Sequence, residues 1–558
     1  MNNLEGKIES IGKLFSAEFF FKIPYYQRPF GWIEENFQDL IDDLTSVAQG
    51  EQYFLGTLVL HKREISKEKF SENSNIEYYY DVVDGQQRLT SLLILFACLR
   101  DKITTEKFKA DIHGKIVQEE NLVDGIPQLP RLEVKDRAIF SELILTPNGT
   151  NSNLDLTTSD EKKLRYYEAV KVFNKKLSTL NEIELQKLTK FINQKCQIIY
   201  LSASTFGDAF RLFSIVNDRG RQLRRIDILK AQNISPETIP LEMTRERVAS
   251  EWEVLEDELG EKSFEAVLHA MRMIIIKEKP QEDLFSEFEN RVFNKGIINQ
   301  GEDFINAVKS YGGLFRQIFI DKDFLKPTHP DYIKFNAMIH IMDTEFEASE
   351  WRACLLSYAK KFFDKNILKF TLYIEKLYLS QWTSSVRKDE RFGDYSKILK
   401  SIDAESEPDN IMKIITIDDK KIITAVKGKN FYTSRYAKYM LLRLEVLASE
   451  HDVYKEINAK SIEHVFPQKP STTSSWVKDK DFKEHSNVVN TIGNLVLLSK
   501  SKNSSASNHD FSTKKEKYLK ERVSDYPRSI QITHEDTWSI EKIKQNTDKI
   551  ALIILRAP

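Results

Sequence analysis

The chain has 558 residues, of which 41% are hydrophobic and 30% charged, and its formal net charge is −2. At this length the composition is typical of a soluble globular protein of about three or four domains. The near-neutral charge excludes binding of nucleic acid through a global basic field, so any DNA contact must come from local clusters of Lys and Arg. Only 19 Gly and 15 Pro are present, which favours a helix-rich body.

The cysteines and the apolar runs indicate the compartment. Cys98, Cys196 and Cys354 lie far apart without a CxxC pair, which argues against a disulfide framework or a zinc site. The first residues lack the apolar core of a signal peptide. The longest apolar run, 92–99, is far shorter than the ~20 residues that cross a bilayer. We therefore expect a cytoplasmic protein with no membrane partner, and leave open whether it is a homo-oligomer.

Near the N-terminus, two aromatic and β-branched segments, 53–60 and 78–83, predict strands. A DGQQR motif at 84–88 follows the second strand, and the periodicity of 86–100 predicts a helix with a strong apolar face. The motif is therefore expected where a strand gives way to a helix N-terminus. Such a junction offers unpaired backbone N–H groups and favours anions.

The rest of the chain is mostly helical by pattern. We expect a strand at 196–202, helices at 210–217 and from 225, and a helical middle between 240 and 400. The acidic stretch 401–409 is a candidate linker, 434–448 and 513–522 predict helices, and the polar stretch 499–508 predicts a loop.

The most informative motifs lie near the C-terminus: IEHVFPQ at 462–468, IGNLVLL at 492–498, and Asn503. Hydrolysis of a phosphodiester near neutral pH needs an activated water and a cation on the phosphate. His464 is the candidate general base, because the pKa of a histidine is about 6.5. Glu463 and Asn503 offer oxygen ligands to Mg²⁺ or Mn²⁺, and Asn494 is expected to hold the turn between them.

Each of these residues alone has an ordinary explanation. A Glu-His pair is seldom catalytic, and a single asparagine is usually a cap or a turn residue. The joint pattern is harder to explain as hydrophobic core. It combines three features: a strand that carries Glu-His, a later Gly-Asn, and a further asparagine nine residues after that.

These motifs resemble the HNH, or ββα-metal, nucleases, and more closely the HNH domain of GmrSD-type, modification-dependent (type IV) restriction endonucleases. The resemblance covers about 434–520 and includes Phe511 with Lys514. The implied roles are His464 as base, Asn494 as the structural middle asparagine, and Glu463 and Asn503 as metal ligands, with a third ligand left open between Asn508 and His509.

A basic helix follows the last of these motifs. Lys514, Lys515 and Lys517, with Lys520 and Arg522 beyond, are candidates to contact the DNA backbone. Such contacts position a duplex without recognising its sequence. A solvated surface helix is the competing interpretation.

The N-terminal motifs suggest a second site. The segment IPYYQRPFGW at 23–32 places a Gln-Arg pair among aromatics, as a surface turn or a pocket wall. Arg88 at a helix N-terminus is unfavourable for the helix dipole unless an anion is also present. With Asp84 it is suited to hold a phosphate together with a metal or a ribose. No P-loop motif is present.

Four motifs, at 23–32, 54–60, 84–88 and 213–230, resemble the GmrS-type domain, which has a ParB/sulfiredoxin-like fold. The resemblance covers about 10–235 and implies binding and hydrolysis of an NTP. The implied pocket residues are Asp84, Gly85, Gln86, Gln87 and Arg88, joined by Gln27 and Arg28. The last motif also contains a basic cluster, Arg219, Arg221, Arg224, Arg225 and Lys230, which fits either a phosphate site or a solvated helix face.

We predict a helix-rich α+β protein with a ParB/sulfiredoxin-like NTP-binding domain at 1–235, a helical middle domain at 236–405 and a ββα-metal (HNH) nuclease domain at 406–558. The predicted function is NTP-regulated cleavage of modified phage DNA with Mg²⁺ or Mn²⁺, in antiviral defence. Two alternatives stay open: a nucleotide-sensing DNA-binding switch with little cleavage, and an RNA nuclease that acts in abortive infection.

Overall fold

The computed structural model describes residues 4–47, 51–64, 78–123, 128–216, 225–449, 454–458, 461–519 and 526–556. The chain forms two compact units. The first comprises residues 1–250 with 300–302, and the second 251–299 with 303–558. Among the described residues, no helix is both long enough and apolar enough to cross a membrane. The predicted division into three domains stays a prediction.

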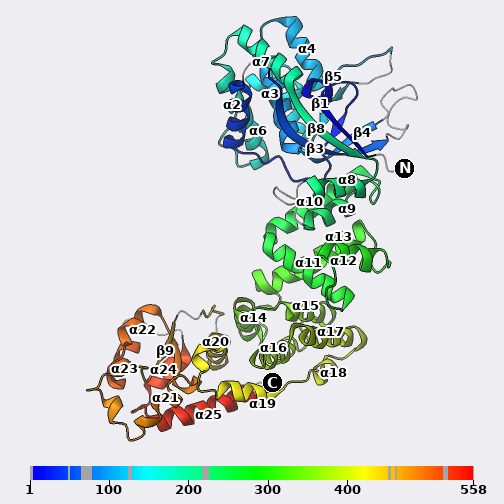
Figure 1. The fold of residues 1–558 in the computed structure, drawn as a ribbon. Helices are drawn as coiled ribbons and strands as arrows, with labels where there is room; N and C mark the ends of the chain where they lie inside the picture. Colours follow the sequence, from blue (N-terminus) through cyan, green and yellow to red (C-terminus); the bar gives the residue numbers. More distant parts are fainter. Residues whose placement is uncertain are drawn as a thin grey trace. The chain divides into compact units, whose positions relative to one another are not determined.

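The first unit is built on a mixed six-stranded sheet in the order β1-β8-β3-β4-β2-β7 (Figure 1). The strands are β1 (Glu5–Ser10), β2 (Phe21–Lys22), β3 (Tyr53–Glu64), β4 (Tyr78–Asp84), β7 (Leu132–Glu133) and β8 (Cys196–Ala203). β8 pairs antiparallel with β1 and parallel with β3, and β3 pairs antiparallel with β4. A separate pair joins β5 (Val117–Gln118) to β6 (Leu129–Pro130). The predicted strands at 53–60, 78–83 and 196–202 are confirmed.

Helix α3 forms the centre of this unit's core. It is apolar on almost every side, and all residues from Leu89 to Arg100 are buried, which is why its sequence runs apolar through 92–99. Helices α4, α6 and α7 pack against it. The helices of this unit are α1 (Ile11–Leu14), α2 (Glu34–Ser46), α3 (Gln86–Lys102), α4 (Glu106–Ile116), α5 (Arg137–Phe140), α6 (Glu161–Leu177), α7 (Glu182–Lys195), α8 (Phe206–Val216), α9 (Arg225–Asn233) and α10 (Glu242–Leu259), which continues past residue 250.

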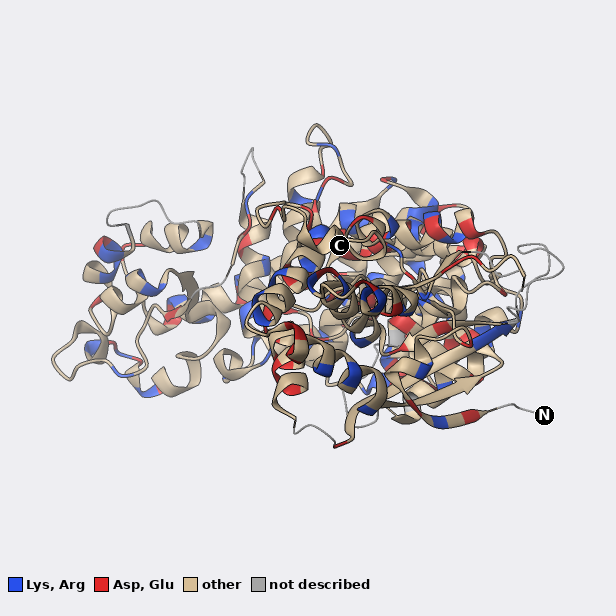
Figure 2. Cartoon of the chain, turned by 90° about the horizontal axis from the view of Figure 1, so that it is seen from above, with Lys and Arg blue, Asp and Glu red and all other residues tan. Residues whose placement is uncertain are grey.

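The second unit begins with packed helices, as predicted for the middle of the chain. They are α11 (Glu261–Ile276), α12 (Leu284–Phe288), α13 (Glu302–Phe315), α14 (Tyr332–Glu345), α15 (Glu350–Phe362), α16 (Ile367–Thr383), α17 (Lys388–Ala404), α18 (Pro408–Lys413), α19 (Asp419–Val426) and α20 (Ala437–Ala448). Lys and Arg are interspersed with Asp and Glu over the chain (Figure 2). The predicted linker at 401–409 is a short connection, because α17 extends to Ala404 and α18 starts at Pro408.

A buried ion pair joins two of these helices. Glu375 of α16 and Arg443 of α20 are fully buried, and Nε of Arg443 lies 2.8 Å from the carboxylate. The hydroxyl of Tyr439 donates to the same oxygen over 2.9 Å. Removal of either charge would leave the other buried and unpaired, which costs about 3–5 kcal/mol.

The C-terminal part of the second unit is an antiparallel hairpin covered by helices. β9 (Ser461–His464) pairs with β10 (Leu495–Leu498), with His464 opposite Leu495. The covering helices are α21 (His485–Val488), α22 (Lys500–Ala506), α23 (Phe511–Leu519), α24 (Pro527–Thr533) and α25 (Ile540–Arg556). The predicted loop at 499–508 is wrong over most of its length, because Ser499 caps α22 by accepting from the N–H of Lys502.

Gly493 explains part of the IGNL motif. A Cβ atom at this position would lie 2.4 Å from the carbonyl oxygen of Ile543 and 2.3 Å from Oγ1 of Thr547, both in α25. Only glycine lets the backbone of α25 approach the hairpin this closely. The motif therefore packs the last helix as well as holding the site.

Candidate active site

The DGQQR motif lies where β4 ends and α3 begins, as the sequence predicts. Gly85 forms the turn with φ of 94°, a backbone conformation that favours glycine. A Cβ atom here would also lie 2.7 Å from Cδ1 of Leu58 in β3. The turn places the first N–H groups of α3 at the edge of the sheet, where they suit an anion.

Three glutamine side chains fasten the segment 23–32 to this junction. Nε2 of Gln27 donates to a carbonyl of β4 over 2.7 Å, and Nε2 of Gln86 donates to a carbonyl of the segment over 2.9 Å. Oε1 of Gln87 accepts from two backbone N–H groups of the segment, at 3.0 and 3.1 Å. The structure therefore brings the motifs at 23–32 and 84–88 together. The three side-chain amides hold the backbone of one motif against that of the other.

The two arginines of these motifs have protein partners. Nη1 of Arg88 donates to the carbonyl of Thr57 over 3.2 Å and packs against Gly56, where a Cβ atom would lie 3.0 Å from it. Burial lowers the pKa of Arg88. Arg28 is 59% exposed and pairs with Asp227 of the fourth motif over 2.6 Å. The junction thus joins all four motifs directly and keeps two guanidinium groups beside it.

Asp84 is the last residue of β4 and is partly buried. Most of the predicted basic cluster cannot be located in the structure. Positions 219, 221 and 224, and the side chain at 225, lie outside the described residues. Lys230 is buried in α9, 3% exposed, so it does not belong to a solvated helix face.

In the second unit, His464 ends β9 and its ring is held from two sides. Nε2 lies 2.9 Å from Oδ1 of Asn490, and the edge of the Tyr432 ring packs at 4.4 Å between centroids. The same Oδ1 accepts from Nε2 of Gln468 over 2.9 Å. Because this oxygen can only accept, Nε2 of His464 carries the proton and Nδ1 keeps the lone pair. The ring is therefore oriented with one nitrogen available as a proton acceptor.

Burial decides the protonation state of this imidazole. It lowers the pKa of His464 to about 4, while the hydrogen bond with Asn490 opposes that shift. The ammonium of Lys514 and the nearby His485 lower the pKa of His464 further. The imidazole is therefore neutral near pH 7, as a general base must be.

Glu463 is placed differently from the predicted metal ligand. Its carboxylate is 5% exposed, and Oε1 accepts from Nζ of Lys514 over 2.6 Å and from the hydroxyl of Tyr518 over 3.0 Å. Nζ of Lys514 also donates to the carbonyl of His464 over 2.7 Å. Because Lys514 is only 1% exposed, the prediction that it contacts DNA is wrong: this lysine is internal and neutralises Glu463.

The two faces of β9 separate the predicted residues. Successive side chains of a strand point to opposite faces. Glu463 faces α23, whereas His464 faces Tyr432 and Asn490. Asn503 of α22 donates from Nδ2 to Oγ of Ser461, and to the carbonyl of Ile462 over 3.1 Å. A shared metal site would require Asn503 to lie close to the imidazole of His464. The structure does not bring these two side chains together.

Asn494 has the structural role that the resemblance implies. It is fully buried and holds the loop after β9 through both of its side-chain groups. Oδ1 accepts from the N–H of Phe466 and Nδ2 donates to the carbonyl of the same residue, both over 2.8 Å. Nδ2 also donates to Val489, and Nε1 of Trp538 donates to Oδ1 over 3.2 Å. Asn494 thus positions the backbone that carries His464.

The remaining predicted residues lie around α22 and α23. Asn508 and His509 are exposed. Lys515 and Lys517 are half-buried; Lys515 donates to the carbonyl of Glu535 over 2.8 Å and Lys517 to Oγ of Ser505 over 3.3 Å. Their contact with DNA stays a prediction, and residues 520 and 522 lie outside the described part of the chain.

Sequence reasoning missed Asn490 and Tyr432. Asn490 lies only four residues before Asn494, in the run Asn487-Val488-Val489-Asn490, and this second asparagine was the available signal. Tyr432 had no signal, because it precedes His464 by 32 positions and only the fold brings the two rings together.

An oriented, neutral histidine is what a site that activates water for hydrolysis needs, and here it lies on a helix-covered hairpin, downstream of an α+β unit with its own motif site. Comparison with protein families identifies the family of the chain. The model of the GmrSD restriction endonuclease N-terminal domain matches residues 11–234, and that of the C-terminal domain matches 416–553. The chain belongs to the GmrSD restriction endonucleases. No curated protein matches the chain.

Proposed function

We propose that this chain is an NTP-regulated, modification-dependent DNA endonuclease with His464 as its general base. Membership of a restriction endonuclease family supports cleavage of DNA in defence against phage. The single observation that carries the chemistry is the orientation of His464, whose Nε2 is bound to Asn490 and whose Nδ1 is left to accept a proton.

In this proposal Nδ1 of His464 takes a proton from water. The resulting hydroxide attacks phosphorus and the bond from phosphorus to the leaving oxygen breaks. The leaving oxygen keeps the bonding electrons and takes a proton from solvent. Asn490 keeps the ring in the required tautomer, as the orienting group of a catalytic histidine does. A pKa of about 4 makes the free imidazole a weak base. The negative charge of a bound phosphodiester opposes that effect, because a nearby anion favours the protonated ring.

The predicted cation does not fit this arrangement through Glu463. An ammonium group already neutralises its carboxylate, and the described residues hold no group of three His, Cys, Asp or Glu side chains that could bind a metal. The involvement of Mg²⁺ or Mn²⁺ therefore stays a proposal. Glu463 could join a metal site only after Lys514 leaves it.

The N-terminal junction is proposed to bind and hydrolyse the NTP. The N-terminus of α3, Arg88 and Arg28 supply positive potential at one end of the sheet, which suits phosphate groups. Arg88→Ala is expected to reduce NTP turnover, whereas Lys102→Ala, at the other end of the same helix, is the matched control. An unchanged turnover in Arg88→Ala would remove the pocket assignment.

The main test is plasmid nicking on DNA with and without base modifications, in the presence of NTP and with or without EDTA. His464→Ala is expected to lose cleavage by about 100-fold or more, the usual contribution of a general base. His534→Ala, an exposed histidine of the same unit, is the control. NTP hydrolysis is expected to persist in both variants. Retained cutting in His464→Ala would remove this residue as the base.

The neutralised Glu463 favours one second candidate, a nucleotide-sensing DNA-binding switch with little cleavage. Under that proposal, the wild-type protein and His464→Ala would be equally inert on every modified DNA while both bind it. Loss of host RNA with intact DNA would instead indicate an RNA nuclease.

A further inference from the structure

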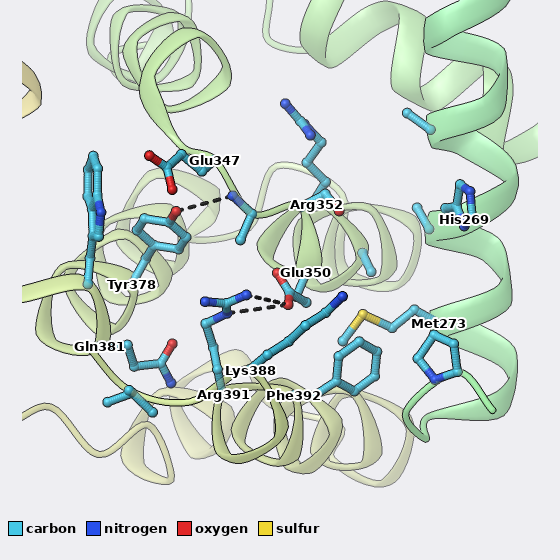
Figure 3. Close-up of a pocket in the computed structure, with 18 of the residues that line it drawn as sticks. His269, Met273, Glu347, Glu350, Arg352, Tyr378, Gln381, Lys388, Arg391 and Phe392 are labelled. Carbon is cyan, nitrogen blue, oxygen red and sulfur yellow. Dashed lines mark hydrogen bonds and ion pairs between the residues drawn. The ribbon is translucent and has the colours of Figure 1, made fainter. Parts of the chain in front are cut away.

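A cavity of about 770 Å³ lies among the helices of the second unit, away from the hairpin. It is bounded by α11, α15, α16 and α17 (Figure 3). Its volume is within the range of cavities that hold small-molecule ligands, about 300–1,000 Å³. Neither the candidate catalytic residues nor the DGQQR junction contribute to its lining.

The lining of this cavity favours an anion. It contains six Lys or Arg residues and three Glu, although the whole chain has slightly more acidic than basic residues. The N-termini of α15 and α17 both reach it, through Glu350 and through Lys388 and Arg391. Helix N-termini present unpaired N–H groups and a positive dipole end to a ligand.

Two of these cations differ in their pairing. Arg391 donates to Oε1 of Glu350 over 3.0 and 3.3 Å, so its charge is partly used within the protein. Lys388, in the first turn of α17, has no ion-pair partner among the residues that the structure describes. Figure 3 shows Lys388 and Arg391 both extending from α17 into the cavity. Among the described residues of the lining, the four arginines are all paired with carboxylates, so Lys388 is one of the two cations, with Lys262, that are available to a ligand.

A buried acceptor in the same cavity lacks a donor. Gln381 of α16 is 5% exposed, and its Nε2 donates to Asp394 over 3.0 Å. Within the described part of the chain, Oε1 of Gln381 has no hydrogen-bond partner. Its oxygen points into the cavity in Figure 3. An unsatisfied buried acceptor is unfavourable, and a ligand N–H would supply the missing donor.

Next to this amide is an aromatic wall. Tyr378 stacks on Phe346 with 3.8 Å between ring centroids, and Trp382 lies 5.6 Å from Tyr378. Tyr378 and Trp382 both line the cavity. Aromatic side chains beside a basic patch are the combination that binds nucleobases and their phosphates.

We propose that this cavity binds one unpaired nucleotide, with its phosphate at the N-termini of α15 and α17 and its base against the aromatic wall, donating to Gln381. The inference rests on the proposed function. A protein that acts on modified DNA has to recognise the modified base, and recognition requires access to that base. The nucleotide is either free in solution or extruded from a duplex, because the contacts are the same.

Photo-crosslinking of the full-length protein tests the site without any need for cleavage. The two probes are 5-iodo-2′-deoxyuridine monophosphate, and a duplex with one 5-iodo-deoxyuridine opposite an abasic position. Cross-linked peptides are mapped by mass spectrometry. We expect adducts in 367–383, the span of α16. Lys388→Glu should reduce their yield about tenfold, whereas Lys400→Glu, an exposed residue of the same helix outside the cavity, should not.

The outcomes separate the two sources and the two proposals. Adducts with the free probe alone indicate a nucleotide effector, and adducts with the duplex alone indicate an extruded base. Absence of adducts in α16 with both probes, or adducts that persist in Lys388→Glu, overturns the proposal. Plasmid nicking is measured in parallel, so loss of the proposed endonuclease activity would not be mistaken for loss of this site.

Discussion

Replacement of Lys514 by methionine should destabilise the C-terminal hairpin and leave the DNA affinity of the folded protein unchanged. The ammonium of Lys514 lies 2.6 Å from the carboxylate of Glu463, and their side chains are 1% and 6% exposed. Removal of the ammonium leaves that carboxylate buried and without its cation, with the hydroxyl of Tyr518 and the backbone N–H of His464 as donors. Breaking a buried pair by removing one partner costs about 3–5 kcal/mol.

The pKa shifts of Glu463 and Lys514 compare the cost of burying the two charges with the attraction between them. Burial raises the pKa of Glu463 and lowers that of Lys514, so for both groups desolvation outweighs their mutual attraction. The pair is therefore not a large net source of stability, although its disruption is costly. The double variant Glu463→Gln with Lys514→Met should recover at least half of the loss, because no charge is then left buried.

The assay is urea unfolding of the full-length protein combined with hydrogen exchange of peptides from β9 and α23. Exchange reports the local opening free energy of the hairpin. Lys517→Met, on the same helix and half-buried, is the matched control, with an expected change within about 0.5 kcal/mol. Unchanged exchange in Lys514→Met, together with weaker DNA binding and a salt dependence reduced by about one ion, would refute the internal role.

Three further predictions concern both sites. The acid limb of kcat/KM for cleavage should lie near pH 4, because burial lowers the pKa of His464 to about 4 and a base works only above its pKa; a limb at pH 6.5 would contradict the buried ring. Asn494→Ala removes three hydrogen bonds to buried backbone and should cost about 3 kcal/mol in urea unfolding, whereas a loss below about 1 kcal/mol would show that the loop holds itself. Gly85→Ala forces a Cβ atom against Leu58 at φ of 94° and should cost about 1–3 kcal/mol; an unchanged melting temperature would show that the turn relaxes freely.

Local patterns predicted the elements that hold the motifs. The aromatic and β-branched runs of β3, β4 and β8 and the apolar helix α3 follow from residue preferences along a short stretch of chain. Gly85 could be placed at a turn for the same reason. The polar stretch 499–508 was misjudged as a loop, because the capping bond of Ser499 outweighs the weak helix preference of its serines and asparagines.

By itself, the sequence determined the α+β class, the family motifs and the histidine that can act as a base, because these depend on residue type and short-range spacing. Only the tertiary structure decided which groups meet. Lys514 follows Glu463 by 51 positions and Tyr432 precedes His464 by 32, yet the fold buries the first pair and packs the rings of the second pair edge to face. Burial and pairing arise from contacts between distant segments, and these contacts set the charge and the partner of each group.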